Sequence, residues 1–467
     1  MTDLLAVHSR QGRRTLATVI LGSGMAILDG SVVNIALRTI GTDLGAGLTQ
    51  LQWVLNGYLL SLASLILVGG ALGDRLGRRR MFLTGVAGFA VSSALCAFAR
   101  SPEQLVAFRV LQGAAAALMT PGSLAIIESG FRAEDRAAAI GTWAGVSGVA
   151  SAIGPLVGGF LIDHAGWRWI FAINVPVCLL VLWLGRGLPE SCDQTDERGR
   201  FDYAGAVLGV AALGALTWGL TSWRDWSAVA ILGWLLAVVA LTTAFVLLER
   251  RPHAMAPVVL FSSRIFSAAN LMTFLVYGAL GSVIFLLVLQ LQVTSGYTPL
   301  EAGLATLPVT IVMLLFSSRA AAVAARIGPR IPMSVGPVVC AAGVLLLSRV
   351  AEDATYVVHV LPGMVLFSIG LTMLVAPLTA AVLGAAPDDR AGVASGINNA
   401  VARSGALLSV AALPALVGLS GDDYRDPAAL TAGFAAGLGL CAALLVGGGI
   451  VSWYGLRPQR TASAELR

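Results

Sequence analysis

The chain has 467 residues, of which 57% are hydrophobic and only 12% are charged. Soluble globular proteins average about 25% charged residues, so this composition excludes an ordinary soluble domain. Apolar runs of about 20 residues are long enough to cross a bilayer core of ~30 Å, and such runs satisfy their backbone groups in lipid as helices. The composition therefore predicts an all-α membrane protein with many spans.

All 30 basic residues are arginines, and the absence of lysine excludes two kinds of chemistry. A nucleotide-binding loop of the G-x-x-x-x-G-K-[ST] type requires lysine, so we expect no use of ATP. A Schiff base with a carbonyl substrate also requires lysine. The histidines and cysteines lack metal-ligand spacing, and no pairing of a nucleophile with a base stands out. We therefore expect no metal, no cofactor and no enzyme.

The apolar runs predict fourteen membrane spans. The first follows Arg10, Arg13 and Arg14 and is longer than the core of a cleavable signal peptide, so we interpret it as a span. The predicted spans cover residues 15–37, 51–72, 81–99, 103–127, 138–162, 168–188, 204–221, 228–248, 268–291, 301–320, 331–349, 356–378, 392–416 and 429–454.

The arginines test this count of spans. With the N-terminus in the cytoplasm, 22 arginines lie on the cytoplasmic side and six on the outer side, while Arg109 and Arg403 fall within spans. Such an asymmetry follows the positive-inside rule. It predicts a multi-pass protein of the cell membrane (inner or plasma membrane) with both termini cytoplasmic. The excess of basic residues therefore reports on topology and predicts no binding of nucleic acid.

Two short segments recur at nearly the same separation. Residues 75–79 (RLGRR) correspond to 326–330 (RIGPR), 251 positions later, and residues 134–137 (EDRA) correspond to 388–391 (DDRA), 254 positions later. These offsets align span one with span nine and predict two six-helix halves of the same orientation, a transporter architecture with its site at mid-depth between the halves. The predicted units are residues 1–188, a linker with two inserted spans at 189–264, and residues 265–467.

A charge inside a span is costly and marks a functional site by default. Asp29 is the only carboxylate well inside an apolar span, roughly 13 Å from its outer end at 1.5 Å per residue. Arg109 in span four lies roughly 9 Å from the same face, so the two side chains can pair. Burial favours the neutral acid and a nearby arginine favours the carboxylate, which suits a proton carrier. A static ion pair that only fixes packing is the alternative.

Span five contains Gly154-Pro155 followed by Gly158-Gly159. Glycine lets helix backbones approach closely, and proline removes one backbone donor, so the helix should bend there. We predict a gating hinge at these four residues. Ordinary packing of small residues is the alternative.

A tight, glycine-rich basic loop joins spans two and three. Asp74 lies near the start of span three, where a carboxylate suits the helix dipole. We predict that this loop takes part in the conformational change and that Asp74 is a latch between the halves, although a solvated loop charge is the alternative. The predicted gating residues of the loop are Gly70, Asp74, Arg75, Gly77 and Arg78.

Several polar or amphipathic side chains lie in or near spans. We expect some of them to line a substrate cavity, although hydrogen bonding between helices is the more common role of such residues. The candidates are Asn34, Trp53, Asn56, Tyr58, Gln112, Gln290, Gln292, Asn398 and Asn399.

Together these segments resemble the fourteen-helix drug:proton antiporters of the major facilitator superfamily, the QacA/EmrB type. Residues 70–79 are similar to the first cytoplasmic-loop motif of that superfamily. Residues 109–113 (RVLQG) resemble its fourth-helix motif, whose arginine is implicated in proton coupling. The glycines and proline at 154–159 resemble its fifth-helix antiporter motif. Residues 28–37 and 167–177 are similar to segments typical of the fourteen-helix branch. Two positions depart from the pattern, because Ser31 stands where threonine is usual and Arg38 where proline is usual.

The resemblance implies a major facilitator fold, with two six-helix bundles and two inserted helices. It also implies proton-coupled efflux of hydrophobic or amphipathic small molecules by alternating access, as in multidrug and antibiotic resistance, with Asp29 and Arg109 coupling the proton. We expect a monomer whose partners are its substrate, protons and the lipid bilayer. Export of an endogenous lipid or secondary metabolite remains an alternative, as does a membrane receptor that no longer transports.

Overall fold

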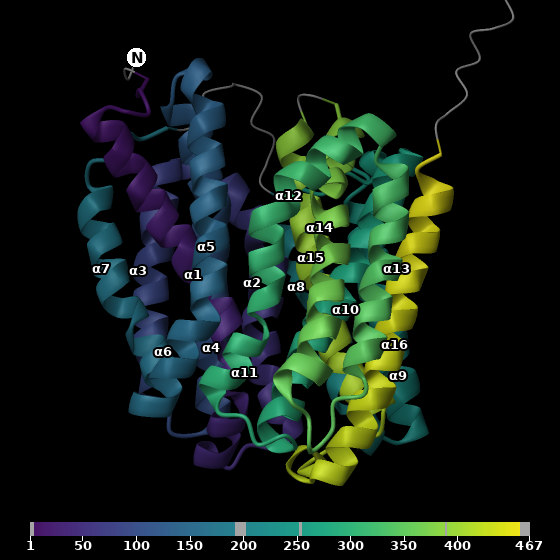
Figure 1. Ribbon diagram of the computed structural model, residues 1–467. Helices are drawn as coiled ribbons and strands as arrows, with labels where there is room; N and C mark the ends of the chain where they lie inside the picture. Colours follow the sequence, from purple (N-terminus) through teal and green to yellow (C-terminus); the bar gives the residue numbers. More distant parts are fainter. Residues whose placement is uncertain (1–3, 192–201, 252–254, 388–389, 458–467) are drawn as a thin grey trace, which may run out of the picture.

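The computed structural model describes residues 4–191, 202–251, 255–387 and 390–457 (Figure 1). Across these residues the fold is built from helices, thirteen of which are long and apolar enough to cross a membrane. The shorter apolar stretch Trp169–Gly185 supplies a fourteenth span. The prediction of an all-α fold with fourteen spans is therefore confirmed. Residues 192–201 of the predicted linker, and Asp388 and Asp389 of the second repeated segment, lie outside the described residues.

The first six spans are formed by seven helices, because span six is divided in two. Their bounds are α1 (Arg10–Leu44), α2 (Leu48–Leu76), α3 (Arg78–Ala97), α4 (Pro102–Gly130), α5 (Ala133–Ala165), α6 (Trp169–Ala172) and α7 (Asn174–Gly185). Two inserted helices follow, α8 (Tyr203–Ser222) and α9 (Ala228–Leu248).

The last six spans include two that are composite. Span ten is formed by α11 (Pro299–Ala305) and α12 (Leu307–Ile327), and span twelve begins as a π-helix, η3 (Tyr356–Val360), that continues into α14 (Leu361–Gly384). The others are α10 (Arg264–Val293), α13 (Arg330–Leu347), α15 (Ala391–Leu416) and α16 (Pro427–Gly455).

Local sequence explains several of these helix ends. Ser9 and Ser101 place their hydroxyls on free backbone N–H groups at the starts of α1 and α4, and Thr298 begins a capping box at the start of α11. α1 ends at Gly45, whose φ of 65° lies in the left-handed region that favours glycine. The apolar runs thus determine that helices form, and the polar residues between them determine where many of them begin and end.

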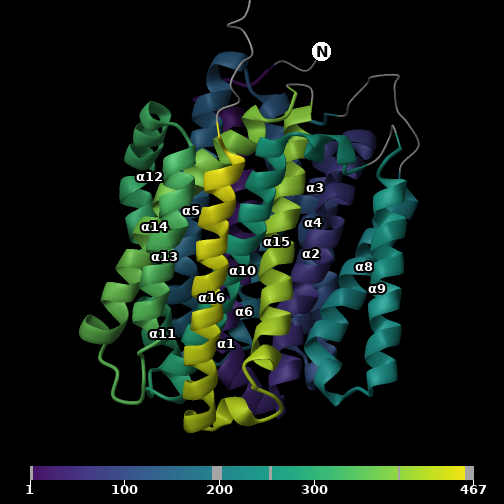
Figure 2. The same cartoon turned by 90° about the vertical axis from the view of Figure 1, so that its right-hand side faces the viewer.

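The helices form two groups that lie side by side, α1–α7 and α10–α16 (Figure 1). The inserted helix α8 contacts both α2 and α15, one helix from each group (Figure 2). None of the residues of α9 is buried. The inserted pair therefore lies at the edge of the bundle, where α8 covers the α2–α15 junction and α9 packs on α8.

Hydrogen bonds join the two groups at the face opposite the N-terminus. Gln292 of α10 donates to the carbonyl of Ile35 in α1 at 2.8 Å, and Arg38 of α1 donates to the carbonyl of Gln292. Gln52 of α2 donates to the carbonyl of Val410 in α15 at 2.7 Å. Arg38, the residue that replaces the usual proline, is therefore one of the groups that hold this face together.

Candidate functional site

Asp29 and Arg109 form an ion pair inside the first helix group. Nη1 of Arg109 lies 2.5 Å from Oδ2 of Asp29, and each side chain is 1% exposed. The second carboxylate oxygen, Oδ1, accepts hydrogen bonds from Gln112 at 2.9 Å and from Asn174 at 3.0 Å. Asp29 and Arg109, which the sequence places at similar depth, therefore do pair. Both oxygens of the buried carboxylate accept hydrogen bonds from donors in α4 and α7.

Arg109 is held by further contacts on other sides. Its Nε donates to the carbonyl of Val54 at 3.1 Å, and its Nη1 also lies 2.6 Å from Oε1 of Gln112. The guanidinium stacks over the ring of Tyr58, 4.3 Å from the ring centroid. If Asp29 takes up a proton, Arg109 therefore keeps three neighbours that can hold its charge in place.

Asn174 is a member of this cluster that the sequence analysis did not single out. It lies at the start of α7, directly after the break between α6 and α7 at Ile173, and is 2% exposed. Its amide also lies 3.4 Å from Oγ of Ser93. The sequence feature that could have identified Asn174 is an amide side chain within the apolar segment WRWIFAINVPV, residues 167–177.

The glycines of α5 allow close contact with α1 and α11. A β-carbon at Gly158 would collide with Val32 of α1, and one at Gly159 would lie 2.5 Å from the Cα of Leu300. A β-carbon at Gly303 of α11 would in turn lie 2.5 Å from the carbonyl oxygen of Pro155. The predicted hinge segment thus lies at the contact between the two groups, on the face opposite the N-terminus.

The predicted basic loop is helical except at Gly77, and Asp74 lies in the last turn of α2 rather than near the start of span three, so the argument from the helix dipole was wrong. The segment is anchored within its own helix group. Asp74 pairs with Arg78 at 2.9 Å, and Gly77 adopts a φ of 106° that favours glycine. The N–H of Arg78 donates to the carbonyl of Ser191, in the segment that follows α7, at 2.9 Å. In this conformation the ion pair of Asp74 is local to the hairpin, and its predicted role as a latch between the groups stays a prediction.

The nine cavity candidates lie in different surroundings. Gln112 and Tyr58 belong to the Asp29 cluster, and Gln292 lies in the junction described above. Gln290 donates to the carbonyl of Val350 at 3.1 Å, and Asn398 donates to Thr273 at 2.8 Å, so both hold helices together. Asn34 and Trp53 are half-buried, Asn56 is buried without a hydrogen-bond partner, and Asn399 is exposed.

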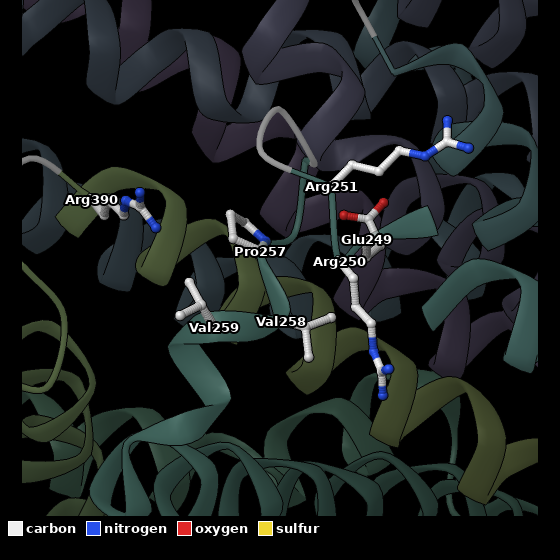
Figure 3. Close-up of a pocket in the computed structure, with 7 residues that line it drawn as sticks. All are labelled: Glu249, Arg250, Arg251, Pro257, Val258, Val259 and Arg390. Atoms are coloured by element: carbon white, nitrogen blue, oxygen red, sulfur yellow. The ribbon is translucent and has the colours of Figure 1, made fainter. Parts of the chain in front are cut away.

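A separate cavity of about 360 Å³ opens near the end of α9 (Figure 3). It is lined by Glu249, Arg250, Arg251, residues 257–259 and Arg390, and contains none of the predicted site residues. The three guanidinium groups point in different directions (Figure 3). This cavity therefore brings no set of groups together on one ligand.

Glu249 borders this cavity and faces a second carboxyl group, that of Asp202. A β-carbon at Gly205 would collide with oxygens of both side chains, and Oε1 of Glu249 has no hydrogen-bond partner. Burial, followed by the neighbouring Asp202, raises the pKa of Glu249 above its ordinary value of 4.5. The two carboxyl groups can hydrogen bond only when one of them carries a proton.

We expect Glu249→Gln to stabilise the protein at neutral pH by about 1 kcal/mol, a typical cost of one buried unsatisfied polar atom. Because the folded state holds the proton of Glu249 more tightly, wild-type stability should fall as pH rises from about 4.5 through the raised pKa. Thermal unfolding in detergent between pH 4 and 8 measures this. The difference in stability between Glu249→Gln and wild type should vanish near pH 4. A difference in stability that stays constant from pH 4 to 8 would contradict the prediction.

Comparisons with known proteins agree with the architecture. The model of the Major Facilitator Superfamily matches residues 19–200 and 201–410. The tetracenomycin C resistance and export protein of Streptomyces glaucescens is 37% identical over 420 residues, covering 88% of this chain and 77% of that protein. The multidrug resistance protein Stp of Mycobacterium tuberculosis is 34% identical over 404 residues, covering 85% of this chain and 74% of that protein.

A solved structure supports the fold. The POT family transporter PepTSo has a TM-score of 0.70 at 16% identity, covering 95% of this chain and 97% of that one. At this identity the likeness concerns the fold alone. The family model and the relatives extend over most of the sequence, and they are transporters rather than enzymes. This chain therefore belongs to the major facilitator superfamily of membrane transporters.

Proposed function

We propose that the protein is a proton-coupled exporter of hydrophobic or amphipathic small molecules. The observation that carries this proposal is the buried ion pair of Asp29 with Arg109. Ionisable side chains inside membrane spans are energetically costly, and they typically mark proton or substrate pathways. The names of the relatives, which concern resistance and export, support the outward direction of transport. The protein would act as a monomer, with protons as the driving ion and no ATP.

The proposed cycle alternates access to a site between the two helix groups. With both termini in the cytoplasm, as the asymmetry of the arginines favours, the face joined by Gln292 and Ile35 is the outer one. The described conformation is then closed toward the outside of the cell membrane. The units 1–188, 189–264 and 265–467 remain our proposed division of the chain.

Proton uptake would loosen the Asp29 cluster. A neutral Asp29 no longer attracts the Arg109 charge, so Arg109 would rest on Val54, Gln112 and the face of Tyr58. Since Asp29 lies on α1, and Val32 one turn later packs against Gly158 of α5, a shift of α1 would reach the helix that contacts the second group. Protonation and the opening of the outer face would be coupled in this way.

The proposal is tested with everted membrane vesicles that carry the protein. A pH-sensitive dye follows the interior after acidification, and compounds from a lipophilic panel are added outside. We expect wild type to release protons when a substrate is added, and Asp29→Asn to release less than about one tenth as much, in the range that removal of an acid–base group usually costs. Glu128→Gln, which changes an exposed carboxylate near the end of α4, serves as the matched control.

Undiminished release by the Asp29 variant would remove the proposed role of this residue. No release for any compound, with correctly inserted wild type, would favour the second candidate, export of one endogenous lipid or secondary metabolite. The specific observation for that candidate is that the tetracenomycin C protein is named for a single compound, whereas Stp is named for many drugs. The lipid and metabolite content of a deletion strain then becomes the test.

A further inference from the structure

Arg403 is a second cation within the membrane-spanning part of the protein, and the proton mechanism does not use it. It lies near the middle of α15, and its side chain is half-buried. Its Nε is inaccessible to water and has no hydrogen-bond partner. Among the residues that the structure describes, no carboxylate forms an ion pair with Arg403.

The surroundings place Arg403 at the junction of the two helix groups. The phenol groups of Tyr58 in α2 and Tyr277 in α10, one helix from each group, lie within electrostatic reach of its charge. It also lies between the two ends of the α2–α15 contact, where Leu67 meets Gly396 and where Gln52 bonds the carbonyl of Val410. The guanidinium therefore faces the interior of the protein rather than lipid.

Two amides of the contacting helices α2 and α15 lack a full set of hydrogen-bond partners. Asn56 follows Gln52 by one turn on the face of α2 that meets α15, and both atoms of its buried amide lack hydrogen-bond partners. Asn399 precedes Arg403 by one turn of α15, and its exposed amide reaches only the carbonyl of Ser395, at 3.5 Å. The contacting helices α2 and α15 thus carry Arg403 together with amides that have spare hydrogen-bonding capacity.

The charges deep in the spans do not balance. Asp29 is already paired with Arg109, so the positive charge of Arg403 has no counter-ion among the described residues. Phenol groups can accept hydrogen bonds from a guanidinium, but they do not neutralise it at neutral pH. A buried charge without a partner is costly, and in a membrane span it marks a substrate or ion pathway.

We propose that Arg403 binds the negatively charged group of the exported compound, so that the preferred substrates are amphipathic monoanions such as aromatic carboxylates and sulfonates. This inference rests on the proposed function, since it names the substrate class of the same exporter. The planar guanidinium can hold the two oxygens of such a group at once. Permanent cations would be repelled by the same charge.

Tyr58 connects this site to the proton site. One face of its ring carries the guanidinium of Arg109, and its hydroxyl donates to the carbonyl of Ala26 at 3.3 Å. The charge of Arg403 lies within electrostatic reach of the same phenol group. A bound anion would therefore act on the same tyrosine that supports Arg109 of the Asp29–Arg109 pair. Exchange of one anion outward for one proton inward moves two charges, and a negative cytoplasm drives both movements.

The test compares two fluorescent probes that share one ring skeleton. 1-Anilinonaphthalene-8-sulfonate is an anion, and N-phenyl-1-naphthylamine is its neutral counterpart. Binding of each probe to purified wild type, Arg403→Gln and Arg403→Lys is measured by fluorescence titration. We expect Arg403→Gln to weaken binding of the sulfonate about tenfold, a typical loss for a charged hydrogen bond, and to change binding of the neutral probe less than about twofold. Arg403→Lys keeps the charge but loses the two-point contact, so it should bind the sulfonate more tightly than Arg403→Gln and less tightly than wild type.

Equal sulfonate affinity in wild type and Arg403→Gln, or equal losses for both probes, would overturn the inference. Thermal unfolding should show that Arg403→Gln is at least as stable as wild type, because no ion pair is broken and an unpaired charge is removed. Arg403→Lys provides a second variant that keeps the charge. Proton release driven by the neutral probe in everted vesicles tests the proposed function separately. That release can fail while the probe titrations support the anion site, or succeed while they reject it.

In vesicles with an imposed potential, negative on the cytoplasmic side, wild type should export the sulfonate with a steeper dependence on voltage than the neutral probe. The extra charge that moves with each anion is the physical reason. Equal voltage dependence for the two probes would show that the sulfonate does not cross as an anion and would overturn the proposed substrate class.

Discussion

Arg109→Gln is expected to abolish substrate-driven proton release and to destabilise the protein by roughly 3–5 kcal/mol, the usual cost of removing one partner of a buried ion pair. The variant leaves Asp29 as a 1% exposed carboxylate without its counter-ion. Gln112 and Asn174 would still donate to Oδ1, but two neutral donors do not replace a full charge. Thermal unfolding in detergent and proton release in everted vesicles measure the two effects.

The double variant Asp29→Asn/Arg109→Gln separates a proton carrier from a static ion pair. Because it removes both charges together, stability should return to within about 1 kcal/mol of wild type. Proton-coupled export should not return, because no carboxylate remains at this position. If the double variant regains both stability and coupled export, the pair only fixes packing.

Gly159→Ala is expected to shift the protein away from the described conformation. The new β-carbon would lie 2.5 Å from Cα and 2.9 Å from N of Leu300, which are backbone atoms that cannot rotate away. Overpacking of this kind costs about 1–3 kcal/mol, enough to change the ratio of two conformations by about 5–150-fold. Gly303→Ala, which would meet the carbonyl of Pro155 from the other side, should act in the same direction.

The chain offers matched controls for this prediction in the same helix. Nothing lies within 4 Å of a β-carbon placed at Gly145 or Gly148, so alanine there should leave the distribution of conformations unchanged. Nitroxide labels on cysteines introduced at the exposed positions Phe160 and Leu304 report the separation of α5 from α11. A longer separation in Gly159→Ala, but not in Gly145→Ala, is the expected result. The same distance in both variants would contradict a gating role for this contact.

Much of the fold could be predicted from the sequence because it depends on local properties. Apolar length predicts a span, and all fourteen predicted spans correspond to helices or helix pairs. The pairing of Asp29 with Arg109 could also be anticipated, since two charges at the same depth of a membrane have few other partners. The breaks at Ile173 and Thr306, which divide two spans, were not predicted, because both lie within continuous apolar runs.

The roles of the polar side chains depended on tertiary contacts. Gln290, Gln292 and Asn398 look alike in sequence, yet the first holds α10 to the chain after α13, the second joins the two helix groups, and the third bonds α10 to α15. Asn174 enters the Asp29 cluster only because α7 packs beside α1 and α3. The depth of a residue in the membrane can be counted along its helix, but the partner of its side chain cannot be predicted from the sequence in this way.

The sequence by itself determined the number of spans and the depth of each buried charge, because hydrophobic length and residue spacing are properties of each segment alone. Only the tertiary structure decided which charge has a partner. Arg109 and Arg403 are both arginines within spans, but α1 brings a carboxylate to the first, while the described residues supply no carboxylate partner to the second. The physical reason is that neutralisation of a buried charge depends on the few groups within hydrogen-bonding distance, and the packing of helices far apart in sequence selects those groups.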